Sequence, residues 1–107
     1  MTRNTFKELV LKPQAIVVNT RDNVATVVDD FPAGTTLHYT LGHAERTVQL
    51  RQDLSMGHKC AICEILVGAD VVKYGESIGS ATADIYPGEH VHVHNVESRR
   101  GGRGPGE

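Results

Sequence analysis

The stretch AIVVNTRDNVATVV at positions 15–28 indicates the fold class of this chain. It contains two short runs rich in β-branched residues, which favour strands because branched side chains pack well on a pleated surface. The polar segment Thr20-Arg21-Asp22-Asn23 separates the two runs and consists of residues typical of turns. The stretch therefore predicts a β-hairpin.

The same alternation of short apolar runs and turns continues toward the C-terminus. Pro and Gly mark two similar turns, Phe31-Pro32-Ala33-Gly34 and Tyr86-Pro87-Gly88-Glu89, and a strand-like segment follows each. Further strands are expected at 35–40, 45–50, 60–67, 71–75, 78–85 and 90–96. None of these segments reaches the length of an ordinary helix, so the sequence predicts an all-β fold.

Residues 15–98 are expected to form a single small domain, because a chain of 107 residues has room for one hydrophobic core. An N-terminal extension at 1–14 precedes it, in which TFKELVL is a candidate short helix ended by Pro13. The Gly- and Arg-rich tail at 99–107 has too little apolar surface to bury, and we expect it to be disordered.

Charge and hydropathy argue against two classes of partner. The formal net charge is −2, and the only basic cluster lies in the C-terminal tail. Without a basic face and stacking aromatic residues, nucleic-acid binding is not expected. No apolar run is long enough to span a membrane or to form the core of a signal peptide. We therefore expect a cytoplasmic protein.

The strongest local signal is His90-Val91-His92-Val93-His94. On a strand, residues two apart share a face and lie about 6.6 Å apart, so the three imidazoles would line one face. Neighbouring imidazoles could bind one metal ion or transfer protons, whereas a solvent-facing polar row is the plainer alternative. The amide of Asn95, which follows, could hold a carboxylate or hydroxyl group, or cap the turn.

Three further segments have both a chemical and a plain interpretation. Gly57-His58-Lys59 could aim an imidazole and an ammonium group at an anion, or be an exposed turn. Lys73-Tyr74-Gly75-Glu76 could place charged side chains beside a ligand, or be a turn between strands. Cys60 and Cys63 lack the further ligands of a closed zinc site, so we expect both to be buried as small apolar residues.

Several of these motifs, taken in order, resemble one known family. They are Gly57-His58-Lys59, the run KYGESIG at 73–79 and the run GEHVHVHN at 88–95. They are similar to motifs in the SAF domain of the altronate and galactarate dehydratases, and the resemblance covers about residues 15–98. It implies a β-clip fold. The segment CAIC at 60–63 departs from the family's pattern, in which a basic residue follows an apolar stretch.

The resemblance also implies a function. In this family the SAF domain is fused to a large catalytic domain or is a separate small subunit. We therefore expect a small subunit that works with a large catalytic chain in the metal-assisted dehydration of a sugar acid such as altronate or galactarate. The expected cofactor is a divalent metal, typically iron(II). The residues carried over are His90, His92 and His94 as catalytic, His92 and His94 as metal ligands, and His58, Lys59, Lys73 and Asn95 as substrate-binding.

Three alternatives remain open at this point. The small subunit of a sulfolactate sulfo-lyase-like enzyme would keep the architecture and act on a three-carbon sulfonate. A non-catalytic module would bind a sugar acid without partner or metal. A metal chaperone or storage protein would need a closed set of ligands from this chain alone. A small subunit without its partner also leaves a surface uncovered, which could support a homo-oligomer.

Overall fold

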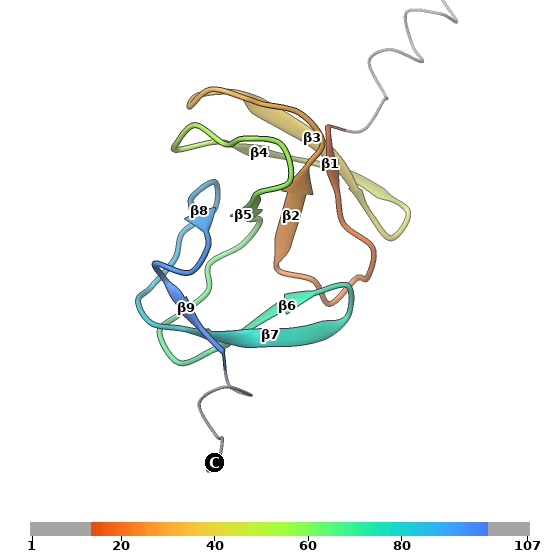
Figure 1. Cartoon of the computed structure of the whole chain (residues 1–107). Coiled ribbons are helices and arrows are strands. Elements are labelled where there is room, and N and C mark those ends of the chain that lie inside the picture. Colours follow the sequence, from red (N-terminus) through yellow and green to blue (C-terminus); the bar gives the residue numbers. More distant parts are fainter. Residues whose placement is uncertain (1–13, 99–107) are drawn as a thin grey trace, which may run out of the picture.

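The computed structural model describes residues 14–98, and within them the chain forms nine strands and no helix (Figure 1). The strands are β1 (Ala15–Ile16), β2 (Val24–Val27), β3 (Thr36–Leu41), β4 (Ala44–Gln49), β5 (Lys59–Ala61), β6 (Asp70–Lys73), β7 (Glu76–Ala81), β8 (His90–Val91) and β9 (Val96–Glu97). The predicted all-β fold is confirmed. Among the described residues, no helix is long and apolar enough to cross a membrane.

The strands pair antiparallel in three small sheets. The central sheet has the order β1-β2-β5-β8, so it joins segments from both halves of the chain. The hairpin β3-β4 forms a second sheet, and β6-β7-β9 form the third. In Figure 1 these two outer sheets lie above and below the central strands. The hairpin predicted at 15–28 is confirmed, because Ala15 pairs with Val27 and Ile16 with Thr26.

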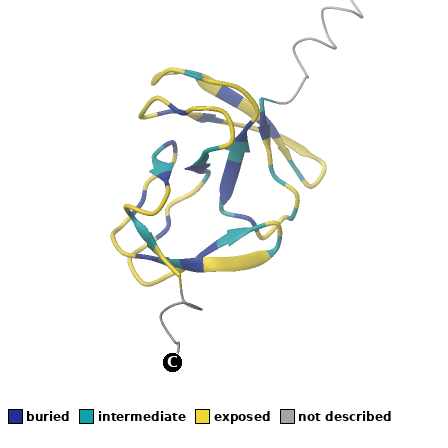
Figure 2. Cartoon of the chain, viewed as in Figure 1, coloured by how far each residue is buried: buried dark blue, intermediate teal, exposed yellow. Residues whose placement is uncertain are grey.

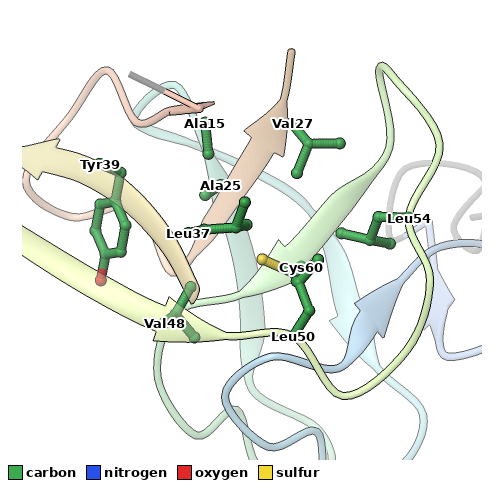
Figure 3. Packing of buried hydrophobic residues seen from close by; sticks show 9 residues of the cluster. All are labelled: Ala15, Ala25, Val27, Leu37, Tyr39, Val48, Leu50, Leu54 and Cys60. Carbon is green, nitrogen blue, oxygen red and sulfur yellow. The ribbon is translucent and has the colours of Figure 1, made fainter. Parts of the chain in front are cut away.

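Two hydrophobic cores use opposite faces of the central strands. Successive residues of a strand project to opposite faces; accordingly Ala25 and Cys60 belong to the first core, and Val24 and Ala61 to the second. The first core, shown in Figure 3, contains Ala15, Ala25, Val27, Leu37, Tyr39, Val48, Leu50, Leu54 and Cys60. The second contains Val24, Ala61, Ile65, Val71, Ala81, Ile85 and Val91. Figure 2 shows buried residues along β2 and exposed residues along the loops of the outer sheets.

One type of turn occurs four times. Each turn has a glycine in its third position with φ between 88° and 92°, a left-handed conformation that the type II turn requires and that favours glycine. In each, the N–H of the fourth residue donates to the carbonyl oxygen of the first. The four turns are Pro32–Thr35, Ser55–His58, Leu66–Ala69 and Tyr86–Glu89. The two turns that share a visible Pro-Gly pattern are therefore half of a larger set.

Single β-bridges join the four turns in two pairs, Phe31 with Leu54 and Ile65 with Ile85. Each turn, together with the acidic residue and the bridge residue around its start, forms one local unit. In the first pair, an aspartate of each unit accepts a hydrogen bond from the turn of the other unit. The Oδ1 atom of Asp30 accepts a hydrogen bond from the N–H of Met56, and Oδ1 of Asp53 accepts one from the N–H of Ala33, both at 2.8 Å.

The second pair keeps only one of these caps. The Oδ1 atom of Asp84 accepts a hydrogen bond from the N–H of Val67 at 2.8 Å. Glu64 stands in the equivalent place of the partner unit, but the residue it would cap is Pro87, which has no N–H. The domain is thus built from two pairs of the same local unit, with one cap deleted by a proline.

Four of the strands predicted beyond residue 30 are shorter than expected. The strand predicted at 71–75 ends at Lys73, because Tyr74 and Gly75 form a turn. The strand predicted at 90–96 is wrong beyond Val91, because residues 92–95 form a turn closed by the side chain of Asn95. The strands predicted at 60–67 and 78–85 end at Ala61 and Ala81, where the acidic caps and glycine turns begin.

The prediction for the cysteines is correct for one of them. Cys60 is buried and Cys63 is exposed. Cys63 lies in the bend that follows β5, beyond the end of the strand that the prediction had extended to residue 67. The predicted N-terminal helix and the tail from residue 99 lie outside the described residues.

Candidate functional site

The antiparallel pairing of β5 with β8 brings two separate motifs together. Cys60 pairs with His90, and Lys59 pairs with Val91. Residues opposite each other in an antiparallel pair project to the same face. His58 lies two residues before Cys60 and ends the second glycine turn, so its side chain shares the face of His90. The sheet register therefore builds the site from segments 32 positions apart.

Four imidazoles meet at this point, and we call His58, His90, His92 and His94 the histidine cluster. The ring centre of His58 lies 5.1 Å from that of His90 and 4.9 Å from that of His92. The rings of His90 and His92 are stacked with centres 5.5 Å apart, and His94 lies 5.2 Å from His90. The Nδ1 atom of His58 and the Nε2 atom of His90 lie 3.0 Å apart.

The surroundings favour neutral imidazoles. Burial lowers the pKa of His90, and the positive charges that His58, His94, His92 and Lys59 can carry lower it further. The pKa of His92 is lowered by the same kinds of cause, desolvation first and the charge of His58 next. A neutral imidazole keeps one ring nitrogen free to accept a proton or to bind a metal ion.

A short turn positions the histidines at its start. The backbone N–H of His90 donates to Oε1 of Gln52 at 2.7 Å. Asn95 closes the turn with both ends of its amide: Oδ1 accepts from the N–H of His92, and Nδ2 donates to the carbonyl oxygen of His90, each at 2.9 Å. Asn95 thus acts on the backbone in this structure, and its predicted contact with substrate stays a prediction.

A depression of about 240 Å³ lies beside the cluster. Its lining consists of Lys59, Ile78, His92, Val93, Val96 and Ser98. Burial lowers the pKa of the Lys59 ammonium group, and the nearby charge of Lys73 adds to this effect. One ammonium group and one imidazole beside apolar walls suit a small anion that has a hydrocarbon chain.

The segment Lys73-Tyr74-Gly75-Glu76 is the hairpin turn between β6 and β7. Tyr74 and Gly75 have φ values of 56° and 81°, as the two central residues of a type I′ turn require. The buried carboxylate of Asp22 holds this turn, since its Oδ1 accepts from the N–H of Gly75 at 2.7 Å. The ammonium group of Lys73 lies 4.9 Å from the ring centre of Tyr74. The turn interpretation is therefore confirmed for this segment, and the predicted contact of Lys73 with substrate stays a prediction.

The cluster has the donor chemistry of a transition-metal site. One ligand atom from each of His58, His90 and His92 lies within 4.8 Å of the other two. Imidazole nitrogen suits iron, zinc, nickel and copper ions better than it suits magnesium or calcium. The residues present therefore fit the divalent metal that the family resemblance implies.

The structure brings together most of the residues predicted from sequence. The predicted histidines meet in the cluster, Lys59 borders it, and Lys73 acts on Lys59 through its charge. Sequence reasoning missed Gln52 and the apolar lining formed by Ile78, Val93 and Val96. Val93 stands inside the histidine motif and Ile78 inside the run at 73–79, but no local pattern shows that these side chains line one depression.

The comparisons with known proteins show the family of the chain. Residues 13–99 match the model of the altronate/galactarate dehydratase SAF domain. The chain is 45% identical over 85 residues to an altronate dehydratase of Escherichia coli (strain K12). The aligned residues cover 79% of this chain and 16% of that protein. It is 37% identical over 84 residues to an altronate dehydratase of Bacillus subtilis (strain 168), covering 78% of this chain and again 16% of the relative.

Another relative is matched over most of its own length. The (2R)-sulfolactate sulfo-lyase subunit alpha of Chromohalobacter salexigens is 38% identical over 76 residues, which is 69% of this chain and 81% of that subunit. The chain thus spans about one sixth of the length of the altronate dehydratases and most of the length of a sulfo-lyase subunit. It belongs to the altronate/galactarate dehydratase SAF domain family.

Proposed function

We propose that this chain is the small subunit of a hydro-lyase that removes water from a sugar acid such as altronate or galactarate, together with a separate large catalytic chain. The observation that carries the proposal is the histidine cluster beside Lys59, which is built from the motifs that match the family.

The substrates named for the two kinds of relative have a chemical group in common. Altronate and sulfolactate both carry a hydroxyl group on the carbon next to the carboxylate. Loss of water or of sulfite from the following carbon gives a 2-oxo acid in either case. A domain common to both kinds of enzyme is suited to hold this constant 2-hydroxy acid end.

Different residues of the site would bind the substrate and transfer the protons. The ammonium group of Lys59 would pair with the substrate carboxylate, since a half-buried cation gains from a neighbouring anion. A neutral imidazole of the cluster would accept the proton from carbon 2 while the bond from carbon 3 to oxygen breaks. A second, protonated group would give its proton to the departing hydroxyl group, so that water leaves and the resulting enol becomes the 2-oxo acid.

A divalent metal, iron(II) in the family, would be held by imidazoles of the cluster. When bound, it would polarise a carboxylate or hydroxyl oxygen and stabilise the developing negative charge.

The site has the character of one side of an interface. Val93 and Ile78 line the depression although 80% and 37% of their surfaces are exposed. Exposed apolar side chains at the rim of a polar site favour coverage by another protein surface. A large chain equivalent to the rest of an altronate dehydratase would cover them and exclude water from the substrate.

A sulfo-lyase small subunit is the second candidate, and one observation favours it. The sulfolactate relative is itself a subunit, and this chain covers 81% of it. The two candidates share the site and differ in the group that leaves carbon 3.

Co-expression with the large dehydratase-like chain of the same genome tests the proposal. The purified pair, with iron(II) present, is assayed against altronate, galactarate, other aldonates and aldarates, and sulfolactate. We expect the two chains to co-purify and to dehydrate a sugar acid, and we expect His92→Ala to abolish turnover while His43→Ala does not. Turnover of sulfolactate alone would replace the first candidate with the second. Binding of a sugar acid by the isolated chain, with no pairing and no turnover, would support a non-catalytic binding module instead.

A further inference from the structure

We propose that His58, His90 and His92 together bind one divalent transition-metal ion on the isolated chain, and that His94 is not a ligand. The inference deepens the proposed function, on which its role in catalysis rests. It differs from the expectation taken from sequence, which placed the metal on His92 and His94.

The spacing of the ring nitrogens supports this set of ligands. Two nitrogen ligands that each lie about 2.1 Å from one ion are about 3.0–3.4 Å apart at right-angled or tetrahedral geometry. Nδ1 of His58 and Nε2 of His90 are separated by 3.0 Å. The ligand atom of His92 lies within 4.8 Å of both. Since the side chain of His92 is exposed, a change of its rotamer can close the remaining distance.

The backbone explains why His94 is set apart. An extended strand would place His92 and His94 on the same face, but β8 ends at Val91 and the chain turns at residues 92–95. Within the described residues the ring of His94 contacts that of His90. The three-residue group with converging ligand atoms contains His58 in its place.

The composition of the group predicts which metal it prefers. All three donors are imidazole nitrogens, which suit iron(II), cobalt(II), nickel(II) and zinc(II), whereas magnesium and calcium prefer oxygen ligands. All six histidines of the chain lie between residues 38 and 94, so variants of described residues account for every imidazole that could bind.

The test uses the full chain, freed of metal by a chelator and titrated without any partner. Calorimetry with zinc(II) and cobalt(II), together with the visible absorption of bound cobalt(II), should show one ion per chain and no heat with magnesium(II). We expect His58→Ala, His90→Ala and His92→Ala each to weaken binding more than about 100-fold, since loss of an outer-shell partner alone costs about 10–100-fold. His94→Ala and His43→Ala are the matched controls and should bind like the unaltered chain.

Thermal unfolding of each metal-free variant shows whether it folds, and His58→Gln serves if His58→Ala does not. The proposal is overturned if the isolated chain binds no transition metal. It is also overturned if His94→Ala abolishes binding while His58→Ala retains it. An active pair whose small chain binds no metal alone would remove this inference and leave the proposed function intact. Metal binding without any lyase activity would leave this inference intact and remove the proposed function.

Discussion

The Nδ1 atom of His58 lies 3.0 Å from the Nε2 atom of His90, although the two residues are 32 positions apart. The contact exists because His58 ends a glycine turn directly before β5, and His90 begins β8, the strand that pairs with β5. The same short pairing that completes the central sheet therefore assembles the histidine cluster. Protonation of the cluster should consequently affect the stability of the fold.

The free energy of unfolding of the metal-free chain should rise with pH below about 6.5. Burial, followed by the charges of His58, His94, His92 and Lys59, lowers the pKa of His90 from its ordinary value of 6.5. Between the lowered pKa and 6.5 the unfolded chain binds more protons than the folded chain, so stability increases with pH and then levels off. Urea denaturation in the presence of a chelator, from about pH 5 to about pH 8, measures this dependence.

A variant tests the contribution of His90. The pKa of His92 is lowered too, so His90→Gln should reduce the rise without removing it. His38→Gln, on the outer strand β3, removes a histidine away from the cluster and should leave the rise in place. An equal pH dependence in His90→Gln and in the unaltered chain would contradict the assignment.

Much of the fold could be predicted from the sequence because several strands carry a clear local pattern. Val24–Val27 is rich in β-branched residues, and Thr36–Leu41 alternates exposed and buried positions. The strand through His90–His94 also alternates perfectly in sequence, yet it ends at Val91. There the side chain of Asn95 offers the backbone hydrogen bonds that compete with the ladder of a strand.

The repeated turn was only half visible. Two of the four turns contain proline, and the turn at Gly57-His58 is one of two interpretations that the sequence leaves open. All four share an acidic residue, an apolar residue and a glycine at fixed spacing, and that spacing is a usable signal for the repeat. The meeting of His58 with His90 had no such signal, because it depends on the register between two distant strands.

Asp84→Ala should destabilise the domain, and Glu64→Ala should not. Asp84 caps the turn of the partner unit by accepting the N–H of Val67, and loss of a comparable helix cap costs about 0.5–2 kcal/mol. Glu64 holds the equivalent place opposite Pro87, which offers no N–H, so its removal should cost no more than about 0.5 kcal/mol, as for other surface changes. Urea denaturation of the two variants compares them directly. Equal losses would show that the cap contributes nothing beyond the charge of an acidic residue.

Gly88→Ala should lower the free energy of unfolding more than Gly68→Ala does. The difference between the two variants isolates the cost of crowding from the cost of the backbone conformation. The two glycines have φ values of 89° and 88°, so alanine at either position incurs the cost of a left-handed conformation, about 1–2 kcal/mol. A methyl group at Gly68 would meet no atom within 4 Å, whereas one at Gly88 would overlap the carbonyl oxygen of Gln49. Overpacking of this kind adds about 1–3 kcal/mol. Thermal and urea unfolding should therefore rank Gly88→Ala as the less stable variant, and the opposite order would contradict the close approach of the backbone at Gly88.

Lys59→Gln should weaken substrate binding by the active pair more than Lys73→Gln does. Lys59 lines the depression together with His92, whereas Lys73 lies over the ring of Tyr74. A hydrogen bond to a charged group contributes about 1.5–3 kcal/mol, so KM should rise about 10- to 100-fold with a smaller change in kcat. The amide of the same sugar acid, which lacks the carboxylate charge, provides the control, because its binding should be equally weak in the unaltered pair and in Lys59→Gln. If Lys59→Gln weakens the acid and the amide by the same factor, the lysine supports the structure of the site and does not recognise the carboxylate.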